Sequence, residues 1–181
     1  MKTIFFDLDG TLLPMDMEVF MKTYLGELER KGSELGYDGK KLVEVVMAGV
    51  GAMVKNDGTK TNEESFWQLF MSHFGGERDK HLEVFDEFYR EDFPKVAQAV
   101  QPTPLANEAV QILKEKGYEL VLATNPLFPR IATLERMRWA GLDPKYFSLI
   151  TTYENSSFCK PNVDYYREIL STLEVKPEEC L

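Results

Sequence analysis

Residues 3–6 form a short run of β-prone and aromatic residues, Thr-Ile-Phe-Phe, which ends at the carboxylate of Asp7. A continuous run of this kind is typical of a strand buried on both faces, as in a parallel sheet. Asp7 then lies at the carboxyl end of the strand, Asp9 follows two residues later, and Gly10 lets the chain leave at a backbone angle that other residues resist. Open α/β sheets bind ligands at this end of their strands, so the stretch predicts a functional site there.

Two carboxylates so close in sequence repel each other, and proteins usually resolve this conflict with a bound cation or with a proton on one carboxyl group. Mg²⁺ suits carboxylates and a strand-end carbonyl because it prefers oxygen ligands. One carboxylate can then attack a substrate while the other handles the proton. The alternative is a strand followed by an acidic turn, because aspartate and glycine are common turn residues.

The chain has 181 residues, which is enough for one domain, or for one domain that carries an insertion. Its net charge of −9 argues against nucleic acid or an anionic membrane surface as a partner. No apolar run approaches the roughly 20 residues that cross a bilayer, and the start of the chain is too short for the core of a signal peptide. We therefore expect a cytoplasmic protein in which Cys159 and Cys180 are reduced thiols.

After Pro14 the strand signal disappears for almost ninety residues, and four amphipathic helical patterns take its place. The third pattern opens with a capping box that pairs Thr61 with Glu64. Each helix needs a partner for its apolar stripe, so a compact four-helix insertion is the simplest arrangement. The alternative is four helices that flank one continuous sheet, but a βαβ alternation would require strands between them.

From residue 101 onward the pattern changes to alternating helices and strands. Thr103 and Pro104 predict the start of a helix that stops at Gly117. We predict strands at 118–123 and 147–151, helices at about 129–139 and around 166–173, and a turn at 175–181 that leads toward another strand. This order of elements predicts an α/β fold with a parallel sheet.

Residues 7–11, Asp-Leu-Asp-Gly-Thr, resemble the first motif of the haloacid dehalogenase-like (HAD) superfamily, in its phosphatase and phosphotransferase branch. Thr124 ends the predicted strand 118–123, where that family places a serine or threonine. Lys160, followed by Pro161, matches the third motif of the family. The three matches occur in the right order, and the resemblance spans nearly the whole chain.

The resemblance implies a Rossmann-like, three-layer core with a parallel sheet, formed by residues 1–14 and 101–181. Residues 15–100 would then be an inserted α-helical cap, hinged near Pro14 and near 102–104. In the family, such caps close over the active site, exclude water and contact the leaving group of the substrate.

The resemblance also implies roles for single residues. Asp7 would be the nucleophile that becomes an aspartyl-phosphate, and Asp9 would protonate the leaving group and then activate water. An acid at position 9 implies the phosphatase branch, since the dehalogenases of the superfamily lack an acid there. Thr124 would bind the phosphoryl oxygens, and Lys160 would offset the negative charge. The implied phosphate-binding residues are Gly10, Thr11, Thr124, Asn125 and Lys160, and the implied ligands of Mg²⁺ are Asp7 and Asp9.

The chain departs from the family pattern at its end. A fourth motif in the family places one or two aspartates after the next core strand, and Leu181 lies about where that strand would begin. We therefore expect the C-terminal core strands to be missing, Mg²⁺ binding to be weakened, and residues 3–7 to be unpaired along one side. A long apolar edge of this kind predicts self-association through the first core strand.

The leading hypothesis is a Mg²⁺-dependent phosphatase that hydrolyses a small phosphorylated metabolite through an aspartyl-phosphate. A phosphomutase-like phosphotransferase is the alternative among enzymes. A catalytically incomplete binding or scaffold protein is the alternative outside enzymes, because the fourth motif is absent from this chain. A phospho-receiver domain ranks last, since its accepting aspartate belongs on a later strand and it has no helical insertion.

Overall fold

A computed structural model describes residues 2–181 and contains a parallel sheet of three strands. The strands are β1 (Thr3–Phe6), β2 (Glu119–Leu122) and β3 (Phe147–Ile150), in the order β1-β2-β3. Thr3 lies opposite Glu119, and Phe6 lies opposite Leu122. Since the strands are parallel, the residues that follow β1, β2 and β3 all emerge at the same edge of the sheet.

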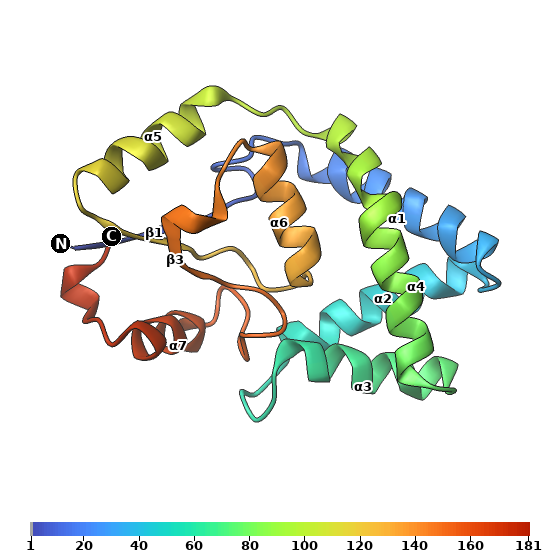
Figure 1. Cartoon of the computed structure of the whole chain (residues 1–181). Helices are drawn as coiled ribbons and strands as arrows, with labels where there is room; N and C mark the ends of the chain where they lie inside the picture. Colours follow the sequence, from blue (N-terminus) through green and yellow to red (C-terminus); the bar gives the residue numbers. More distant parts are fainter. Residues whose placement is uncertain (1) are drawn as a thin grey trace.

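Helices cover both faces of the sheet and produce three layers (Figure 1). These helices are α5 (Pro104–Glu115), α6 (Arg130–Trp139) and α7 (Val163–Leu173). Ile4 and Leu120 belong to the large apolar core with residues of α5 and α6, whereas Val121 packs with Tyr165 and Ile169 of α7. Consecutive strand residues point to opposite faces, which is why both faces of these short strands are apolar. The predicted α/β fold is confirmed.

Four helices lie between β1 and α5, at one end of the molecule (Figure 1). They are α1 (Met17–Glu34), α2 (Gly39–Val54), α3 (Asn62–Phe74) and α4 (Arg78–Glu91), followed by a 3₁₀ helix, η1 (Phe93–Ala99). Helix α1 packs on α2, and α2 packs on α3. The predicted capping box is confirmed, because the Thr61 side chain accepts from the Glu64 N–H while the Glu64 carboxylate accepts from the Thr61 N–H.

The chain enters and leaves this helical segment at adjacent points. Met15 and Val100 form an antiparallel bridge, and the Gln101 N–H donates to the Pro14 carbonyl over 2.8 Å. The chain therefore passes between the helices and the sheet at one place, while α4 and η1 also pack directly on α6. The prolines and the change of periodicity in the sequence predicted a boundary at these positions.

The last residues of the chain lie along the outer side of β1, and both ends of the chain meet there (Figure 1). After η3 (Pro177–Glu179), Cys180 bridges Thr3 in parallel, the Leu181 N–H donates to the Thr3 carbonyl, and the Phe5 N–H donates to the Leu181 carbonyl. The expectation that residues 3–7 are unpaired along one side is therefore wrong for Thr3 to Phe5. Self-association through this strand stays a prediction.

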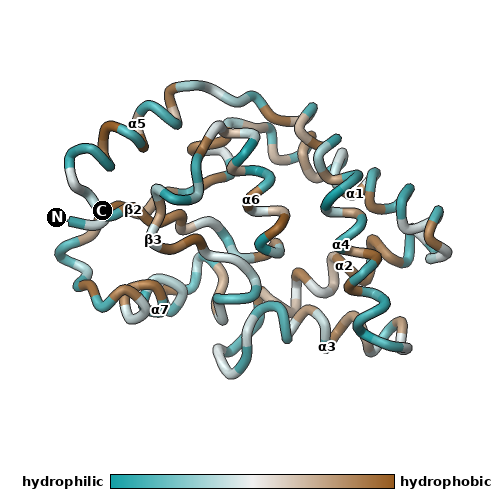
Figure 2. Tube along the Cα trace, viewed as in Figure 1, coloured by the Kyte–Doolittle hydropathy of each residue, from teal (hydrophilic) through white to brown (hydrophobic). Residues whose placement is uncertain are grey.

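Apolar residues concentrate on the strands and on the inner faces of the helices, and polar residues on the outside (Figure 2). The strand residues Leu120, Val121 and Leu122 are fully buried. Among residues 2–181, no helix is both long enough and apolar enough to span a bilayer.

The close approach of α1 and α2 generates a first prediction. A Cβ atom at Gly39 would collide with the Ser33 hydroxyl and the Glu29 main-chain oxygen of α1, whereas a Cβ at Gly51, in the same helix as Gly39, would meet nothing within 4 Å. We expect Gly39→Ala to lower the free energy of unfolding by roughly 1–3 kcal/mol, because backbone cannot move aside as a flexible side chain can. Gly51→Ala should raise it by roughly 0.5–1 kcal/mol.

Urea denaturation followed by circular dichroism measures both changes. Equal effects of the two substitutions would contradict the described packing of α1 against α2.

Candidate active site

Asp7 and Lys160 are in direct contact at the carboxyl edge of the sheet. Asp7 follows β1, Lys160 lies in the loop between β3 and α7, and Lys160 Nζ donates to Asp7 Oδ1 over 2.8 Å. The two side chains are 39% and 23% exposed. The structure thus brings together two of the residues that the sequence singled out, and it leaves the Asp7 carboxylate open to solvent on one side.

Gly10 and Thr11 form a tight turn directly after the strand. Gly10 has a φ of +77°, a region that favours glycine. Its N–H donates to the Leu13 carbonyl over 2.9 Å, and the Thr11 N–H donates to the Leu8 carbonyl over 3.1 Å. Both backbone donors are already used within the turn, which leaves the exposed Thr11 hydroxyl as the group of this turn that could reach a phosphate.

Thr124 and Asn125 follow β2 and connect it to the neighbouring loops. The Thr124 carbonyl accepts from the Thr151 hydroxyl over 2.7 Å and from the Tyr165 hydroxyl over 2.8 Å. The Asn125 Oδ1 accepts from the Lys160 N–H over 3.1 Å. Thr124 is 1% exposed, and its own hydroxyl has no hydrogen-bond partner among the described residues. A buried hydroxyl without a partner is unusual, and an oxygen of a bound phosphate would supply one.

Asp9 pairs with an arginine that the sequence did not single out. Arg136, in α6, is fully buried and forms an ion pair with Asp9 Oδ2. Its guanidinium also donates to the Thr133 hydroxyl over 3.3 Å and lies 4.3 Å from the centre of the Phe128 ring. Asp9 Oδ1 is buried without a partner among the described residues. The two neighbouring acids are therefore each paired with a different cation, Asp7 with Lys160 and Asp9 with Arg136.

The first residue of α3, Asn62, connects the helical segment to two loops of the site. Asn62 is fully buried, and its amide donates to the Pro126 carbonyl over 3.2 Å and to the Cys159 sulfur over 3.3 Å. Its backbone N–H donates to the Ser156 carbonyl over 2.8 Å. Burial raises the pKa of Cys159 to about 12, so this free cysteine is a neutral thiol. Asn62 thereby positions the loops that carry Thr124 and Lys160.

The acids of the site could hold a hard cation only together with water molecules as further ligands. Within residues 2–181, no three His, Cys, Asp or Glu side chains gather closely enough to bind a metal ion. Mg²⁺ usually keeps several waters and binds proteins through one or two carboxylates. Asp7 receives its hydrogen bond at Oδ1 and is partly exposed, and the main-chain carbonyl of Asp9 follows two residues later at the strand end. The donor set of Asp7 and Asp9 therefore fits Mg²⁺.

The sequence matches the family model of the haloacid dehalogenase-like hydrolases over residues 1–181. The chain belongs to this family of hydrolases. Comparison with curated proteins gives no match.

Solved structures of the same superfamily share the fold. A HAD phosphatase from Thermococcus onnurineus is 21% identical with a TM-score of 0.54, and the match covers 99% of this chain and 75% of that chain. A HAD-superfamily hydrolase from Geobacter sulfurreducens is 19% identical with a TM-score of 0.52, and the match covers 99% of this chain and 77% of that chain. An L-2-haloacid dehalogenase from Xanthobacter autotrophicus is 14% identical with a TM-score of 0.52, and the match covers 99% of this chain and 68% of that chain. At these identities the similarity establishes the fold.

The Asp9–Arg136 pair generates a second prediction. We expect Arg136→Met to lower the free energy of unfolding by roughly 3 kcal/mol, because it leaves a partly buried carboxylate without its cation. Arg138→Met is the matched control in the same helix, since Arg138 is 68% exposed and pairs with Glu135. That change should cost less than about 1 kcal/mol.

Urea titration of both variants decides between a structural pair and an incidental one. A loss at position 136 no larger than the loss at position 138 would contradict the assignment.

Proposed function

We propose that this chain is a Mg²⁺-dependent phosphatase that hydrolyses a small phosphorylated metabolite through an aspartyl-phosphate. The observation that carries the proposal is the cluster at the end of β1, where the half-exposed Asp7 contacts Lys160 near a buried Thr124 hydroxyl that lacks a partner. An attacking carboxylate, a fixed cation and a free donor are what phosphoryl transfer requires, since most of its catalysis is positioning and charge stabilisation.

The chemistry proceeds in two displacements. An oxygen of Asp7 forms a bond to phosphorus while the bond to the ester oxygen breaks, and Asp9 gives its proton to that leaving oxygen. Water then attacks the phosphorus, its proton passes to Asp9, and the bond to Asp7 breaks to release inorganic phosphate. Lys160 and Thr124 stabilise the charge on the phosphoryl oxygens in both steps. Arg136 pairs with the Asp9 carboxylate after its proton has passed to the leaving oxygen.

Mg²⁺ would be held by the Asp7 carboxylate and the Asp9 main-chain carbonyl, where it would neutralise charge on the phosphoryl group. The second acid supports a phosphatase over a dehalogenase, because dehalogenases of the superfamily lack an acid at that position. A cytoplasmic location fits the two free cysteines, Cys159 and Cys180.

We also propose that residues 15–100 act as a cap over residues 1–14 and 101–181. The adjacent crossings at Pro14 and Gln101 support this division, because the chain passes between the two parts at one place, where both crossings can act as a hinge. Asn62 would fasten the cap in its closed position.

Substitution of the two acids tests the roles directly. Asp7→Asn should abolish Mg²⁺-dependent hydrolysis of p-nitrophenyl phosphate, since an amide cannot attack phosphorus, and Asp9→Asn should reduce it by roughly 10²–10⁴-fold. Asp16→Asn is the matched control, because Asp16 caps α1 and asparagine caps a helix equally well. Wild-type rates in the Asp7→Asn protein would refute the nucleophile.

Thr124 offers a test that separates function from stability. Thr124→Val should leave the free energy of unfolding unchanged or raise it by up to ~1 kcal/mol, because it removes a buried hydroxyl without a partner. The same change should lower kcat/KM by roughly 10²-fold. Thr151→Val is the contrast, since the Thr151 hydroxyl donates to the Thr124 carbonyl and its loss should destabilise the fold by roughly 1–3 kcal/mol.

Thermal unfolding and steady-state rates of the two variants are the measurements. A Thr124→Val protein that is destabilised yet fully active would show that the hydroxyl has a structural partner and no phosphate to bind.

A further inference from the structure

The side chain of Tyr165 lies in the core, in contact with the end of β2. Tyr165 is the third residue of α7 and is fully buried, whereas its neighbour Tyr166 is 40% exposed. It packs with Ile169, one turn further along α7, and with Val121 of β2. The inner face of α7 therefore brings a buried phenol to the strand that leads into the proposed phosphate-binding loop.

The Tyr165 hydroxyl holds the main chain of that loop. It donates to the Thr124 carbonyl over 2.8 Å, and burial raises the pKa of Tyr165, so the phenol keeps its proton at physiological pH. The Thr151 hydroxyl donates to the same carbonyl over 2.7 Å, but the Leu122 carbonyl is also within its reach, at 3.2 Å. Since a threonine hydroxyl has one proton, Thr151 cannot serve both carbonyls fully. Tyr165 thus supplies the bond that Thr151 can lose to Leu122.

The direction of the Thr124 carbonyl determines the direction of the next N–H. The peptide between Thr124 and Asn125 is trans and planar, so its carbonyl and its N–H point in opposite directions. A carbonyl held by the two hydroxyls therefore turns the Asn125 N–H away from them. That N–H makes no hydrogen bond to the main chain of residues 2–181. It is available to an oxygen of a bound phosphate.

The ring of the same tyrosine lies beside the lysine of the site. Lys160 Nζ is 5.8 Å from the centre of the Tyr165 ring, which is within the range of a cation–π contact. The Lys160 N–H donates to Asn125 Oδ1 over 3.1 Å, which ties the loop of the lysine to the loop after β2. Tyr165 therefore contacts both loops whose groups would meet the phosphate.

Helix α7 gives this tyrosine a firm support. Asn162 caps the helix, because its side chain accepts from a backbone N–H of the first turn over 2.9 Å. The Glu168 carboxylate accepts from the Ser157 N–H over 3.0 Å and fastens the helix to the loop that leads to Lys160. The phenol is thus placed by a helix that is held at its start and along its length.

We propose that Tyr165 is a positioning residue of the active site, whose hydroxyl holds the Thr124 carbonyl and thereby aims the Asn125 N–H at a phosphoryl oxygen. The inference rests on the proposed phosphatase function. Tyr165 is fully buried and touches neither the substrate nor the reacting atoms, so it acts through the peptide that it holds. A donor aimed in advance stabilises the phosphoryl oxygens without a cost of reorganisation during the reaction.

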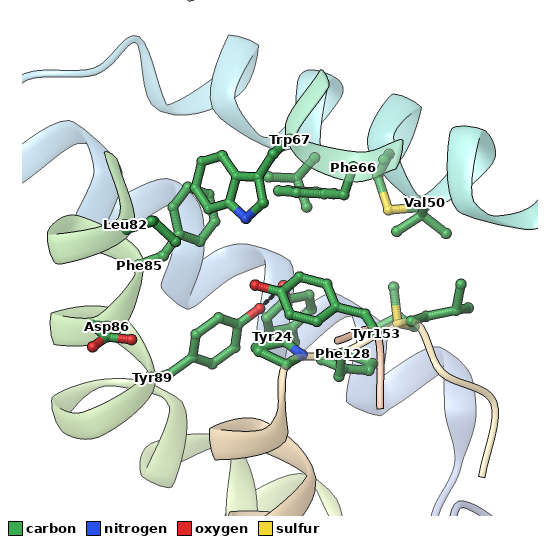
Figure 3. A pocket seen from close by; sticks show the side chains of 15 residues that line it. Tyr24, Val50, Phe66, Trp67, Leu82, Phe85, Asp86, Tyr89, Phe128 and Tyr153 are labelled. Atoms are coloured by element: carbon green, nitrogen blue, oxygen red, sulfur yellow. Dashed lines mark hydrogen bonds between the residues drawn. The ribbon is translucent and has the colours of Figure 1, made fainter. Parts of the chain in front are cut away.

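Removal of the hydroxyl alone tests the proposal. Tyr165→Phe deletes the donor and keeps the ring beside Lys160. Tyr89→Phe is the matched control, because the hydroxyls of Tyr89 and Tyr24 bond to each other over 3.1 Å in an aromatic cavity that α1, α2, α3 and α4 largely enclose (Figure 3). Tyr89 is 7% exposed, and no residue of the proposed active site lines that cavity. The two changes should lower the melting temperature by similar amounts, since each removes a hydrogen bond of a buried phenol.

Backbone ¹⁵N relaxation of the protein without substrate measures how firmly the donor is aimed. The order parameter of the Asn125 N–H should fall from about 0.85, the value of rigid backbone, to below about 0.7 in Tyr165→Phe. It should keep its wild-type value in Tyr89→Phe. An order parameter that is unchanged in Tyr165→Phe overturns the proposal, because the tyrosine would then not fix this peptide.

Inhibition by inorganic phosphate tests the same donor at the site. Tyr165→Phe should raise the inhibition constant of phosphate roughly tenfold and lower kcat/KM for p-nitrophenyl phosphate by a similar factor, because one donor is no longer aimed. The Mg²⁺ concentration for half-maximal activity should change by less than about twofold, since the cation would lie at Asp7 and Asp9. A shift of the Mg²⁺ dependence as large as that of phosphate, or equal losses in Tyr89→Phe, would show a general loosening and overturn the proposal.

The two proposals fail separately. If the wild-type chain hydrolyses no phosphate ester while the Asn125 order parameter falls in Tyr165→Phe, the phosphatase proposal fails and the tyrosine still fixes the peptide. If the wild-type chain hydrolyses esters and Tyr165→Phe matches it in kcat/KM and in phosphate inhibition, the positioning role fails and the phosphatase proposal stands.

Discussion

Two carboxylates placed two residues apart at the end of a buried strand must each be compensated, and this requirement ties distant parts of the chain together. Their repulsion is strong where water is partly excluded. Asp7 finds Lys160, which lies 153 residues away in the sequence, and Asp9 finds Arg136, 127 residues away. Helix α6 and the loop before α7 therefore both have to meet at the end of β1. The arrangement of the elements around the sheet and the pairing of the two carboxylates therefore depend on each other.

The sequence predicted the strands and helices well because their signals are local. Apolar runs marked β1 and β2, and Thr61 and Thr103 marked helix starts that the structure confirms. Lys160 was predicted because Lys160 and Pro161 match the third motif of the family, whereas its position in a loop would not by itself distinguish it from other lysines. Arg136 could not be predicted, since the neighbouring Arg138 looks the same in sequence and is 68% exposed. What buries Arg136 is contact with Asp9 and Phe128, which periodicity within one helix cannot reveal.

Buried polar atoms without hydrogen-bond partners mark the places where a bound ligand could supply the missing hydrogen bond. Among residues 2–181, four side-chain atoms are in this position: Asp9 Oδ1, Trp67 Nε1, Thr124 Oγ1 and Glu154 Oε2. Each costs free energy, of the order of 1–3 kcal/mol, that a bound ligand could recover. Two of the four, Asp9 Oδ1 and Thr124 Oγ1, belong to the proposed active site. No sequence pattern marks such atoms, because the absence of a partner appears only once the whole fold surrounds them.

Asn62 has a consequence for the timing of events at the site. Its side chain holds the loop after β2 and the loop after β3 at once, through Pro126 and Cys159. If the four helices move away from the sheet, both bonds break together and a fully buried amide enters water. Intermediate positions would lose the bonds without gaining hydration, so the motion would be a discrete jump with a barrier. Each opening would also loosen the loops of Thr124 and Lys160, so release of product and relaxation of the catalytic loops become one event.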